Sequence, residues 1–198
     1  MTALATAVTA RARRAAGGFT LIELLVTVVV LSILLGLGVP AFRSFMQNDQ
    51  QWAQINTLVV GLNSARSEAI KNDLTAGAQI CSSSDGTRCT ATAWDQGWIV
   101  LGVDPAHPRG PLKPLQVVGA LPLGTTLTEA NNNLTITFVS NGTLDTSSLQ
   151  NPTARVGFTM CDARGAASAR YLEVTLMGRV VASPVVGQYP NGAPLSCP

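Results

Sequence analysis

One carboxylate, Glu23, lies inside an otherwise apolar stretch that runs from Phe19 to Val39. The stretch would form a helix ~31 Å long, close to the thickness of the hydrocarbon core of a bilayer. A charged group in such a segment is costly and is usually paired. If the chain were cut between Gly18 and Phe19, the new α-amino group would lie one helical turn from Glu23. In a helical array, that amine of an incoming subunit would neutralise Glu23 of a neighbour, so we expect Glu23 to be an assembly residue.

The apolar stretch is open to simpler interpretations. A secretory signal peptide would explain the basic residues before it, but the run is long for one and no A-x-A-like site follows. A plain membrane anchor would place the N-terminus in the cytoplasm, because Arg11, Arg13 and Arg14 precede the run. Glu23 would then be a carboxylate that reaches toward the headgroups.

The rest of the chain offers little for catalysis. The single histidine, His107, lies between two prolines in a predicted loop and is expected at the surface. No Ser–His–acid set, paired-carboxylate motif or phosphate-binding loop is present, and the cysteine spacing does not match a zinc site. We assign Trp94 and Trp98 to the core. The sequence predicts no catalytic residue, no metal site and no cofactor.

The four cysteines, Cys81, Cys89, Cys161 and Cys197, all follow the apolar stretch. An even number fits two disulfides formed in an oxidising compartment, and free buried thiols are the alternative. Cys81 and Cys89 flank the turn signal Asp85-Gly86, so a small loop closed by this pair is reasonable. Cys161 and Cys197 would then pair by elimination, although four cysteines allow three connectivities.

Charge is distributed unevenly. The chain of 198 residues has 13 basic and 11 acidic side chains and a formal charge of +2. Because three of the arginines precede Phe19, the remainder is close to neutral. Any binding of nucleic acid would therefore have to be local.

The pattern beyond the apolar stretch predicts a helix and then strands. Gly36, Gly38 and Pro40 weaken the helix where the apolar stretch ends. From 41 to 72 apolar residues recur at spacings of three and four, which predicts a face against the core. This face comprises Phe42, Phe45, Met46, Trp52, Ile55, Leu58, Val59, Leu62, Ala65, Ala69 and Ile70, and the opposite face carries Arg43, Asn48, Gln51, Asn56, Asn63 and Lys71. Short β-prone runs follow at 78–81, 97–103, 115–118, 125–128, 134–139, 155–161, 171–177 and 180–183, with turn-rich pieces between them.

The stretch "GFTLIELLVTVVVLSILLGLGVPAF" resembles the N-terminus of type IV pilins and pseudopilins. The resemblance implies that a prepilin peptidase cuts after Gly18 and methylates the new N-terminus, Phe19. It places the family's assembly glutamate on Glu23 and its helix proline on Pro40. Gly17 stands where the family has a basic residue.

Within that superfamily, "LNSARSEAIKND", "DQGWIVL", "ITFVSNGTL" and "CDARGAASARYLEVTLMGRVVAS" are similar to the FimT/GspH group of minor pilins and pseudopilins. The implied fold class is α+β, with a long N-terminal helix packed on a C-terminal antiparallel β-sheet domain. The resemblance also implies that a disulfide between the last two cysteines, Cys161 and Cys197, holds the C-terminal segment in place. We expect a leader at 1–18, a transmembrane and assembly segment at 19–40, an amphipathic half-helix at 41–74 and a periplasmic β-rich domain at 75–198.

The resemblance implies a minor type IV pilin, with a GspH-type pseudopilin of type II secretion as the alternative. Its partners would be other pilin or pseudopilin subunits, the prepilin peptidase and the inner membrane, which the chain would cross once with a cytoplasmic N-terminus before entering a pilus. Double-stranded DNA is a further candidate partner, because some FimT-type minor pilins bind DNA through a C-terminal Gly-Arg-X-Arg element; the alternative is a solvated turn with isolated surface arginines. Here Gly178-Arg179-Val180-Val181 keeps only the first arginine. Arg179 with Arg164 and Arg170 would form the DNA-binding patch, since phosphate binding needs several cations together.

Overall fold

The computed structural model describes residues 18–72, 77–104, 106–107, 110–151 and 155–197. The expected leader therefore lies outside the described residues except for Gly18. The chain divides into two compact units, Met1–Met46 and Gln47–Pro198.

Helix α1 (Leu21–Lys71) is 51 residues long and continues through Gly36, Gly38 and Pro40. Every residue from Gly18 to Gln50 is exposed. Among the described residues, α1 alone is long and apolar enough to cross a membrane.

The C-terminal part of α1 packs through a narrower face than the sequence predicts. Its buried residues are Gln51, Ile55, Leu58, Gly61, Leu62, Ala65 and Ala69. Phe42, Phe45 and Met46 are exposed because they precede the unit that contains the sheets. The prediction was also wrong for Ile70 and Trp52, which are half exposed, and for Gln51, which is buried rather than on the outer face.

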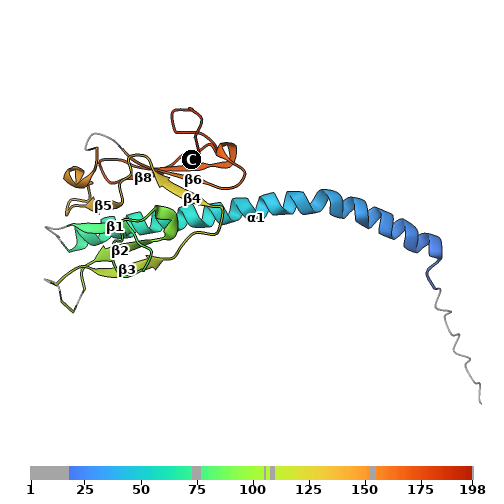
Figure 1. Ribbon diagram of the computed structural model, residues 1–198, viewed down its shortest axis with the longest axis horizontal. Helices are drawn as coiled ribbons and strands as arrows, with labels where there is room; N and C mark the ends of the chain where they lie inside the picture. Colours follow the sequence, from blue (N-terminus) through green and yellow to red (C-terminus); the bar gives the residue numbers. More distant parts are fainter. Residues whose placement is uncertain (1–17, 73–76, 105, 108–109, 152–154, 198) are drawn as a thin grey trace, which may run out of the picture. The chain divides into compact units, whose positions relative to one another are not determined.

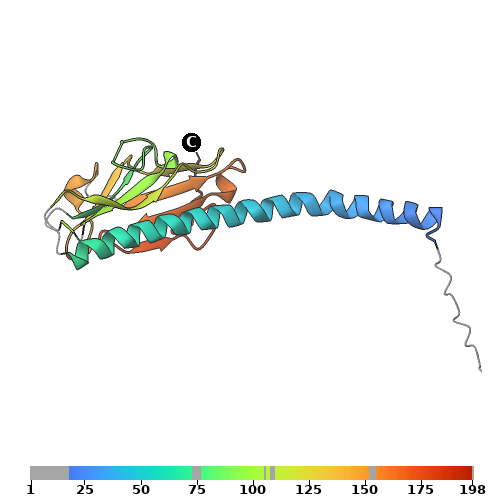
Figure 2. The same ribbon diagram turned by 90° about the horizontal axis from the view of Figure 1, so that it is seen from below.

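In the part of the chain that the structure describes, two antiparallel sheets of four strands each pack against this part of α1 (Figures 1 and 2). The first sheet has the order β3-β2-β1-β5 and consists of β1 (Ala78–Ser82), β2 (Trp98–Gly102), β3 (Lys113–Val118) and β5 (Thr135–Phe138). The second has the order β4-β6-β7-β8 and consists of β4 (Thr126–Glu129), β6 (Val156–Cys161), β7 (Arg170–Val174) and β8 (Val180–Ala182). The short 3-10 helices η1 (Trp94–Gln96), η2 (Thr146–Ser148) and η3 (Ala166–Ser168) lie between strands. The predicted α+β class, a long helix packed on antiparallel sheets, is confirmed.

One core joins α1 to both sheets. It includes Leu58 and Leu62 of the helix, Ile80 of the first sheet and Phe158 of the second. Alternate residues of β6 face this core, which is the two-residue period of a strand.

Trp94 and Trp98 are both buried in the core, as expected. The indole N–H of Trp94 donates to the carbonyl of Asn133 at 2.8 Å, and its ring meets Phe158 edge-to-face at 4.9 Å. A buried indole that keeps its hydrogen bond fixes the loop before β5 against the core.

Strand β7 ends at Val174, three residues earlier than predicted, because the chain turns between Thr175 and Arg179. The Gly178 amide donates to the carbonyl of Thr175, and Gly178 has φ +72°. Arg66 of α1 donates to the carbonyls of Gly142 and Met177 and so ties this turn to the helix.

Gly178→Ala should destabilise the protein by about 3 kcal/mol. A Cβ at this position would collide with the carbonyl oxygen of Gly142, in addition to the ~1 kcal/mol cost of the left-handed conformation. Gly192→Ala is the matched control, because Gly192 has φ +83° with open space around its Cβ position. Denaturant unfolding should show a loss of about 1 kcal/mol for that control. Equal losses for the two variants would contradict the steric argument.

Candidate functional site

The start of α1 leaves one polar side chain without a partner. Thr20 precedes the helix, and its hydroxyl accepts the backbone N–H of Glu23 at 3.3 Å. The hydroxyls of Thr27 and Ser32 bond back to the carbonyls of Leu24 and Val29. Among the described residues, the Glu23 carboxylate makes neither an ion pair nor a hydrogen bond. A group outside the described residues must therefore compensate Glu23 if this segment enters lipid.

The two disulfides join Cys81 to Cys89 and Cys161 to Cys197, the pairing that the sequence favoured. The first closes a short loop after β1. The second attaches the C-terminal segment to the end of β6.

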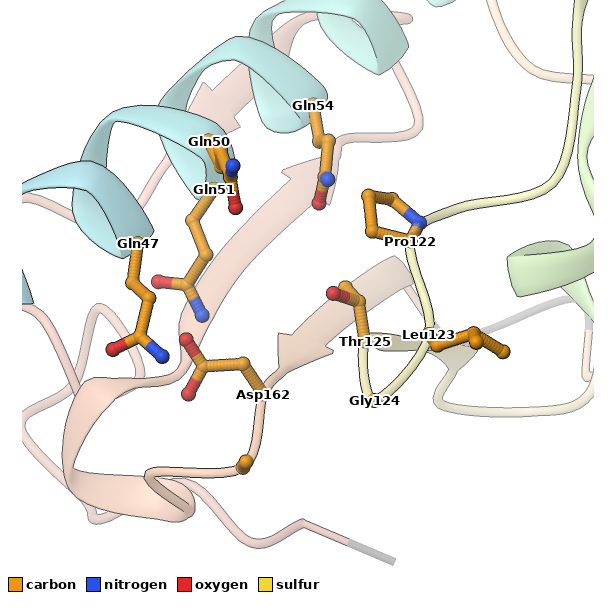
Figure 3. A pocket seen from close by; sticks show the side chains of 10 residues that line it. Gln47, Gln50, Gln51, Gln54, Pro122, Leu123, Gly124, Thr125 and Asp162 are labelled. Carbon is orange, nitrogen blue, oxygen red and sulfur yellow. The ribbon is translucent and has the colours of Figure 1, made fainter. Parts of the chain in front are cut away.

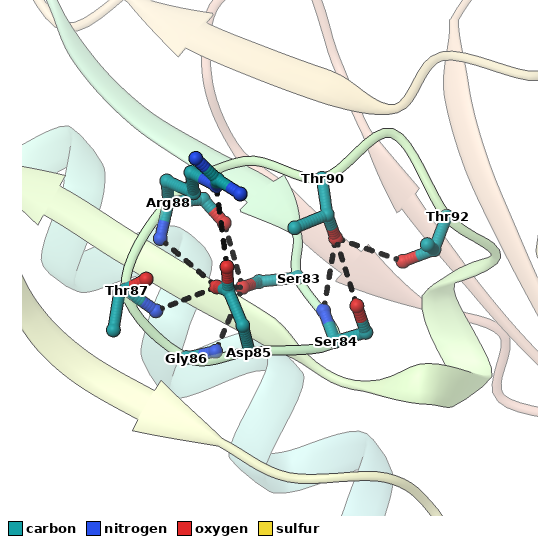
Figure 4. Close-up of polar contacts among 8 residues, drawn as sticks. All are labelled: Ser83, Ser84, Asp85, Gly86, Thr87, Arg88, Thr90 and Thr92. Atoms are coloured by element: carbon teal, nitrogen blue, oxygen red, sulfur yellow. Dashed lines mark hydrogen bonds and ion pairs between the residues drawn. The ribbon is translucent and has the colours of Figure 1, made fainter.

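Asp85 organises the loop that the first disulfide closes (Figure 4). Its carboxylate accepts the backbone N–H groups of Thr87 and Arg88 at 2.9 and 3.2 Å, and the hydroxyl of Ser83 at 3.2 Å. The hydrogen bond from the Thr87 backbone is the main reason that the pKa of Asp85 falls to about 2. This carboxylate accepts hydrogen bonds from its own turn, so its role is to stabilise the loop rather than to bind a ligand.

His107 lies in an exposed loop with its Nδ1 atom 3.1 Å from Asp104. Lys113 and His107 together lower the pKa of Asp104 to about 2 through their hydrogen bonds. Among the described residues no three His, Cys, Asp or Glu side chains come close enough to hold a metal ion.

The three arginines expected to bind DNA do not share one exposed patch. Arg164 binds the Asp162 carboxylate at 2.7 Å and the Asn48 side chain at 2.8 Å. Arg170 is 8% exposed, and its guanidinium lies 3.9 Å from the centre of the Trp52 ring. Arg179 is exposed, but it follows the far end of β7, a strand that Arg170 begins. The structure therefore brings Arg164 and Arg170 to one end of the second sheet and leaves Arg179 at the other.

Burial disfavours ionisation of Asp162, but the hydrogen bonds from Arg164 outweigh it and lower the pKa of this carboxyl. Burial, followed by repulsion from Arg164, lowers the pKa of Arg170. Arg164 and Arg170 are both engaged in local contacts, so they are poorly placed to contact phosphates.

A polar pocket that sequence reasoning missed lies beside Asp162 (Figure 3). It has a volume of about 100 Å³ and is lined by Gln47, Gln50, Gln51, Gln54, Pro122, Leu123, Gly124, Thr125, Asp162 and Ala163. The four glutamines recur at spacings of three and four in "QNDQQWAQ", which places them on neighbouring positions of α1. That spacing was the signal in the sequence that could have revealed the pocket. It was missed because glutamine is a polar residue, which predicts exposure to solvent.

Gln51 is the anomalous member of this pocket. It is 2% exposed, and neither its amide nitrogen nor its amide oxygen has a hydrogen-bond partner among the described residues. Figure 3 shows Gln47 and Gln51 pointing toward Asp162. A buried amide without partners costs stability, because water no longer satisfies it.

Gln51→Met should raise the thermal stability of the protein. Methionine has a similar length and removes two unpartnered polar atoms, a gain of about 1 kcal/mol or roughly 2–4 °C in Tm. Asn56→Met is the matched control, because Asn56 is an exposed amide on the same helix and its replacement should change stability by less than about 0.5 kcal/mol. A lower Tm for Gln51→Met would mean that the amide is satisfied in solution.

Comparison with known proteins gives matches over both parts of the chain. A family model described as Type II transport protein GspH matches residues 54–178, and a model of the prokaryotic N-terminal methylation motif matches residues 13–39. A crystal structure of the type IV minor pilin FimU of Pseudomonas aeruginosa is 23% identical, with a TM-score of 0.54 over 77% of this chain and 98% of that chain. A second crystal form of FimU is 24% identical, with a TM-score of 0.49 over 72% and 95%. A search of curated proteins gave no match.

Proposed function

We propose that this chain, which belongs to the GspH family, is a minor type IV pilin. It would act as a structural subunit of pilus assembly or priming. The family consists of structural pilins and pseudopilins rather than enzymes. The chain shares its fold with the minor pilin FimU, a long helix on antiparallel sheets. The N-terminal methylation motif at residues 13–39 supports processing by a prepilin peptidase.

Glu23 carries the proposal. It is the one polar side chain between Leu21 and Val39 that has no partner within the described part of the chain. Cleavage after Gly18 would free the amine of Phe19, which the peptidase would then methylate. That cationic amine of one subunit would pair with Glu23 of its neighbour and set the register of the helices. Assembly, not turnover, is the mechanism.

The proposed location follows from the same segment. Residues 19–40 would cross the inner membrane with the N-terminus in the cytoplasm, and Pro40 would lie where the helix leaves it. Residues 41–74 and the β-rich domain at 75–198 would then lie in the periplasm, where the two disulfides can form. After assembly the subunit would belong to the pilus, among other pilins.

A pseudopilin of a type II secretion system is the second candidate, favoured by the description of the matching family model. Both candidates use the same N-terminal chemistry, so the genetic context separates them. Mature protein that reaches sheared pili and depends on pilus genes would support the first. Dependence on secretion genes alone would support the second.

Glu23→Ala should leave the precursor inserted in the membrane and strongly reduce its recovery in sheared filaments, because the incoming amine loses its counter-ion. Glu23→Asp keeps the charge and should retain a larger share of incorporation. Mass spectrometry of the wild-type mature protein should find an N-methylated Phe19 as its first residue. An intact leader, or full incorporation of Glu23→Ala, would contradict the proposal.

DNA binding would rest on Arg179, the exposed member of the three arginines. A single cation gives weak, salt-sensitive attraction to a duplex. We therefore expect the full-length protein in detergent to shift double-stranded DNA weakly at low salt, and Arg179→Ala to remove that shift. A tight shift that survives Arg179→Ala would place the DNA contact elsewhere.

A further inference from the structure

The outer face of the second sheet carries a cavity of about 190 Å³. It is lined by Arg155, Tyr171, Glu173, Tyr189, Pro190 and Asn191. Tyr171 and Glu173 belong to β7, and Arg155 precedes β6. The remaining three residues belong to the C-terminal segment, which the Cys161–Cys197 disulfide attaches to β6. The cavity therefore has one wall from the sheet and one from the tail.

Tyr171 contributes an unused hydrogen-bonding group. The residue is 8% exposed, yet its hydroxyl makes no hydrogen bond with any of the described residues. Its ring lies over Gly157, where a Cβ would collide with the phenol. Burial, and then the charge of Glu173, raise the pKa of Tyr171 to about 12, so the phenol keeps its proton at neutral pH. A hydroxyl that can donate and accept is therefore held at the cavity without a hydrogen-bond partner among the described residues.

Tyr189 adds a second aromatic wall. Its ring meets the Tyr171 ring edge-to-face, with centroids 4.8 Å apart and planes at 70°. The backbone N–H of Tyr189 donates to the carbonyl of Ala193 at 2.8 Å. The Asn191 side-chain oxygen accepts the Ala193 N–H, which leaves the Asn191 amide N–H groups free as donors among the described residues. The turn at 189–193 is thus held by its own hydrogen bonds.

The charges that line the cavity cancel. Arg155 Nη1 lies 3.0 Å from Glu173 Oε1, and the Glu173 side chain is 10% exposed while that of Arg155 is 69% exposed. The other oxygen of Glu173 has no partner within the described part of the chain. The cavity therefore offers donors from Tyr171, Arg155 and Asn191 and an acceptor from Glu173, with no net charge.

This set of groups matches one class of ligand. Several hydrogen-bond donors and acceptors beside aromatic rings suit a ring that carries hydroxyl groups on its edge and C–H groups on its faces. Neither an anion nor an amine gains a free counter-ion, because Arg155 and Glu173 already pair. The volume corresponds to about six waters at ~30 Å³ each, which is room for one small ring.

We propose that this cavity binds a single neutral sugar unit, with Tyr171 and Glu173 hydrogen-bonded to its hydroxyls and Tyr189 against its ring. The ligand is a free monosaccharide or the terminal unit of a glycan, which share this chemistry. The site is independent of the N-terminal assembly chemistry.

The test uses the full-length protein in a detergent without a sugar headgroup. The free probes are galactose, mannose and N-acetylglucosamine, followed by saturation-transfer NMR, and the same sugars are displayed as terminal units on a glycan array. Glucuronate and glucosamine serve as charged comparisons. We expect at least one neutral sugar to bind, and to bind more tightly than either charged probe. Binding on the array alone would identify the terminal unit of a glycan as the ligand. Binding of the free sugar would identify the monosaccharide as the ligand.

Two variants locate the site. Tyr171→Phe removes one oxygen atom and should weaken binding about fivefold to tenfold, the effect of one hydrogen bond. Tyr189→Ala should weaken it at least as much, while Asn56→Ala, on an exposed face of α1, should bind like the wild type. If Tyr189→Ala fails to fold, Tyr171→Phe decides. The proposal is overturned if no neutral sugar binds in either format, if a charged probe binds more tightly, or if Tyr171→Phe binds unchanged.

Discussion

The close approach of α1 to the sheets is the contact that organises the whole of residues 47–198. Small residues, Gly61, Ala65 and Ala69, alternate on the buried face with Leu58 and Leu62, so the helix backbone can come near the strands while the leucines fill the space between them. At Gly61 even a methyl group would lie 3.1 Å from the Ile80 side chain. Because one helix serves as the packing surface for both sheets, the core lies between them, and their outer faces are left to loops and to the C-terminal segment.

Buried polar atoms without partners in the described chain lie both in the main core, at the Trp98 indole nitrogen, and outside it, at Gln51, Gln54 and Arg170. In the described chain the buried amide of Gln51 and the Nε atom of Arg170 have no hydrogen bonds. Tyr171, whose hydroxyl also makes none with the described residues, lines the cavity beside Glu173. The buried atoms of Gln51 and Arg170 cost free energy in the isolated subunit, since a buried polar group has lost its water. Sequences that fold well are consistent at every level, and departures from that consistency mark functional positions more often than the core. The three groups are therefore better candidates for contacts with other molecules than the fully bonded Asp85 loop.

The sequence predicted the fold well because the spacing of apolar residues indicates which side chains are buried. The three- and four-residue spacing after Trp52 identified most of the buried face of α1, and β-prone runs between turn-rich pieces located the described strands to within a few residues. Gln51 was misplaced because amphipathicity assigns polar residues to solvent, whereas Gln51 is buried beside Asp162 and the loop at 122–125. The arginine patch failed for a related reason. Residues 164, 170 and 179 are near in sequence, but β7 separates Arg170 from Arg179. In addition, Arg164 is paired with Asp162 and Arg170 is stacked on Trp52. The tyrosine-lined cavity could not be predicted from local sequence, because Tyr189 reaches Tyr171 only through the fold of the C-terminal segment and its disulfide.

The C-terminal disulfide explains how that return is maintained. The tail covers the outer face of β6 and β7 through a small apolar cluster of Cys161, Ala169, Tyr171 and Leu195, which is separate from the main core. Four buried residues bury too little area to hold a segment of this length against its conformational entropy. The Cys161–Cys197 bond closes a loop with a sequence separation of 36, which in the chain-entropy model removes about 4 kcal/mol from the stability of the unfolded state. The covalent bond therefore supplies the stabilisation that the cluster lacks, so the wall that carries Tyr189 depends on an oxidising environment.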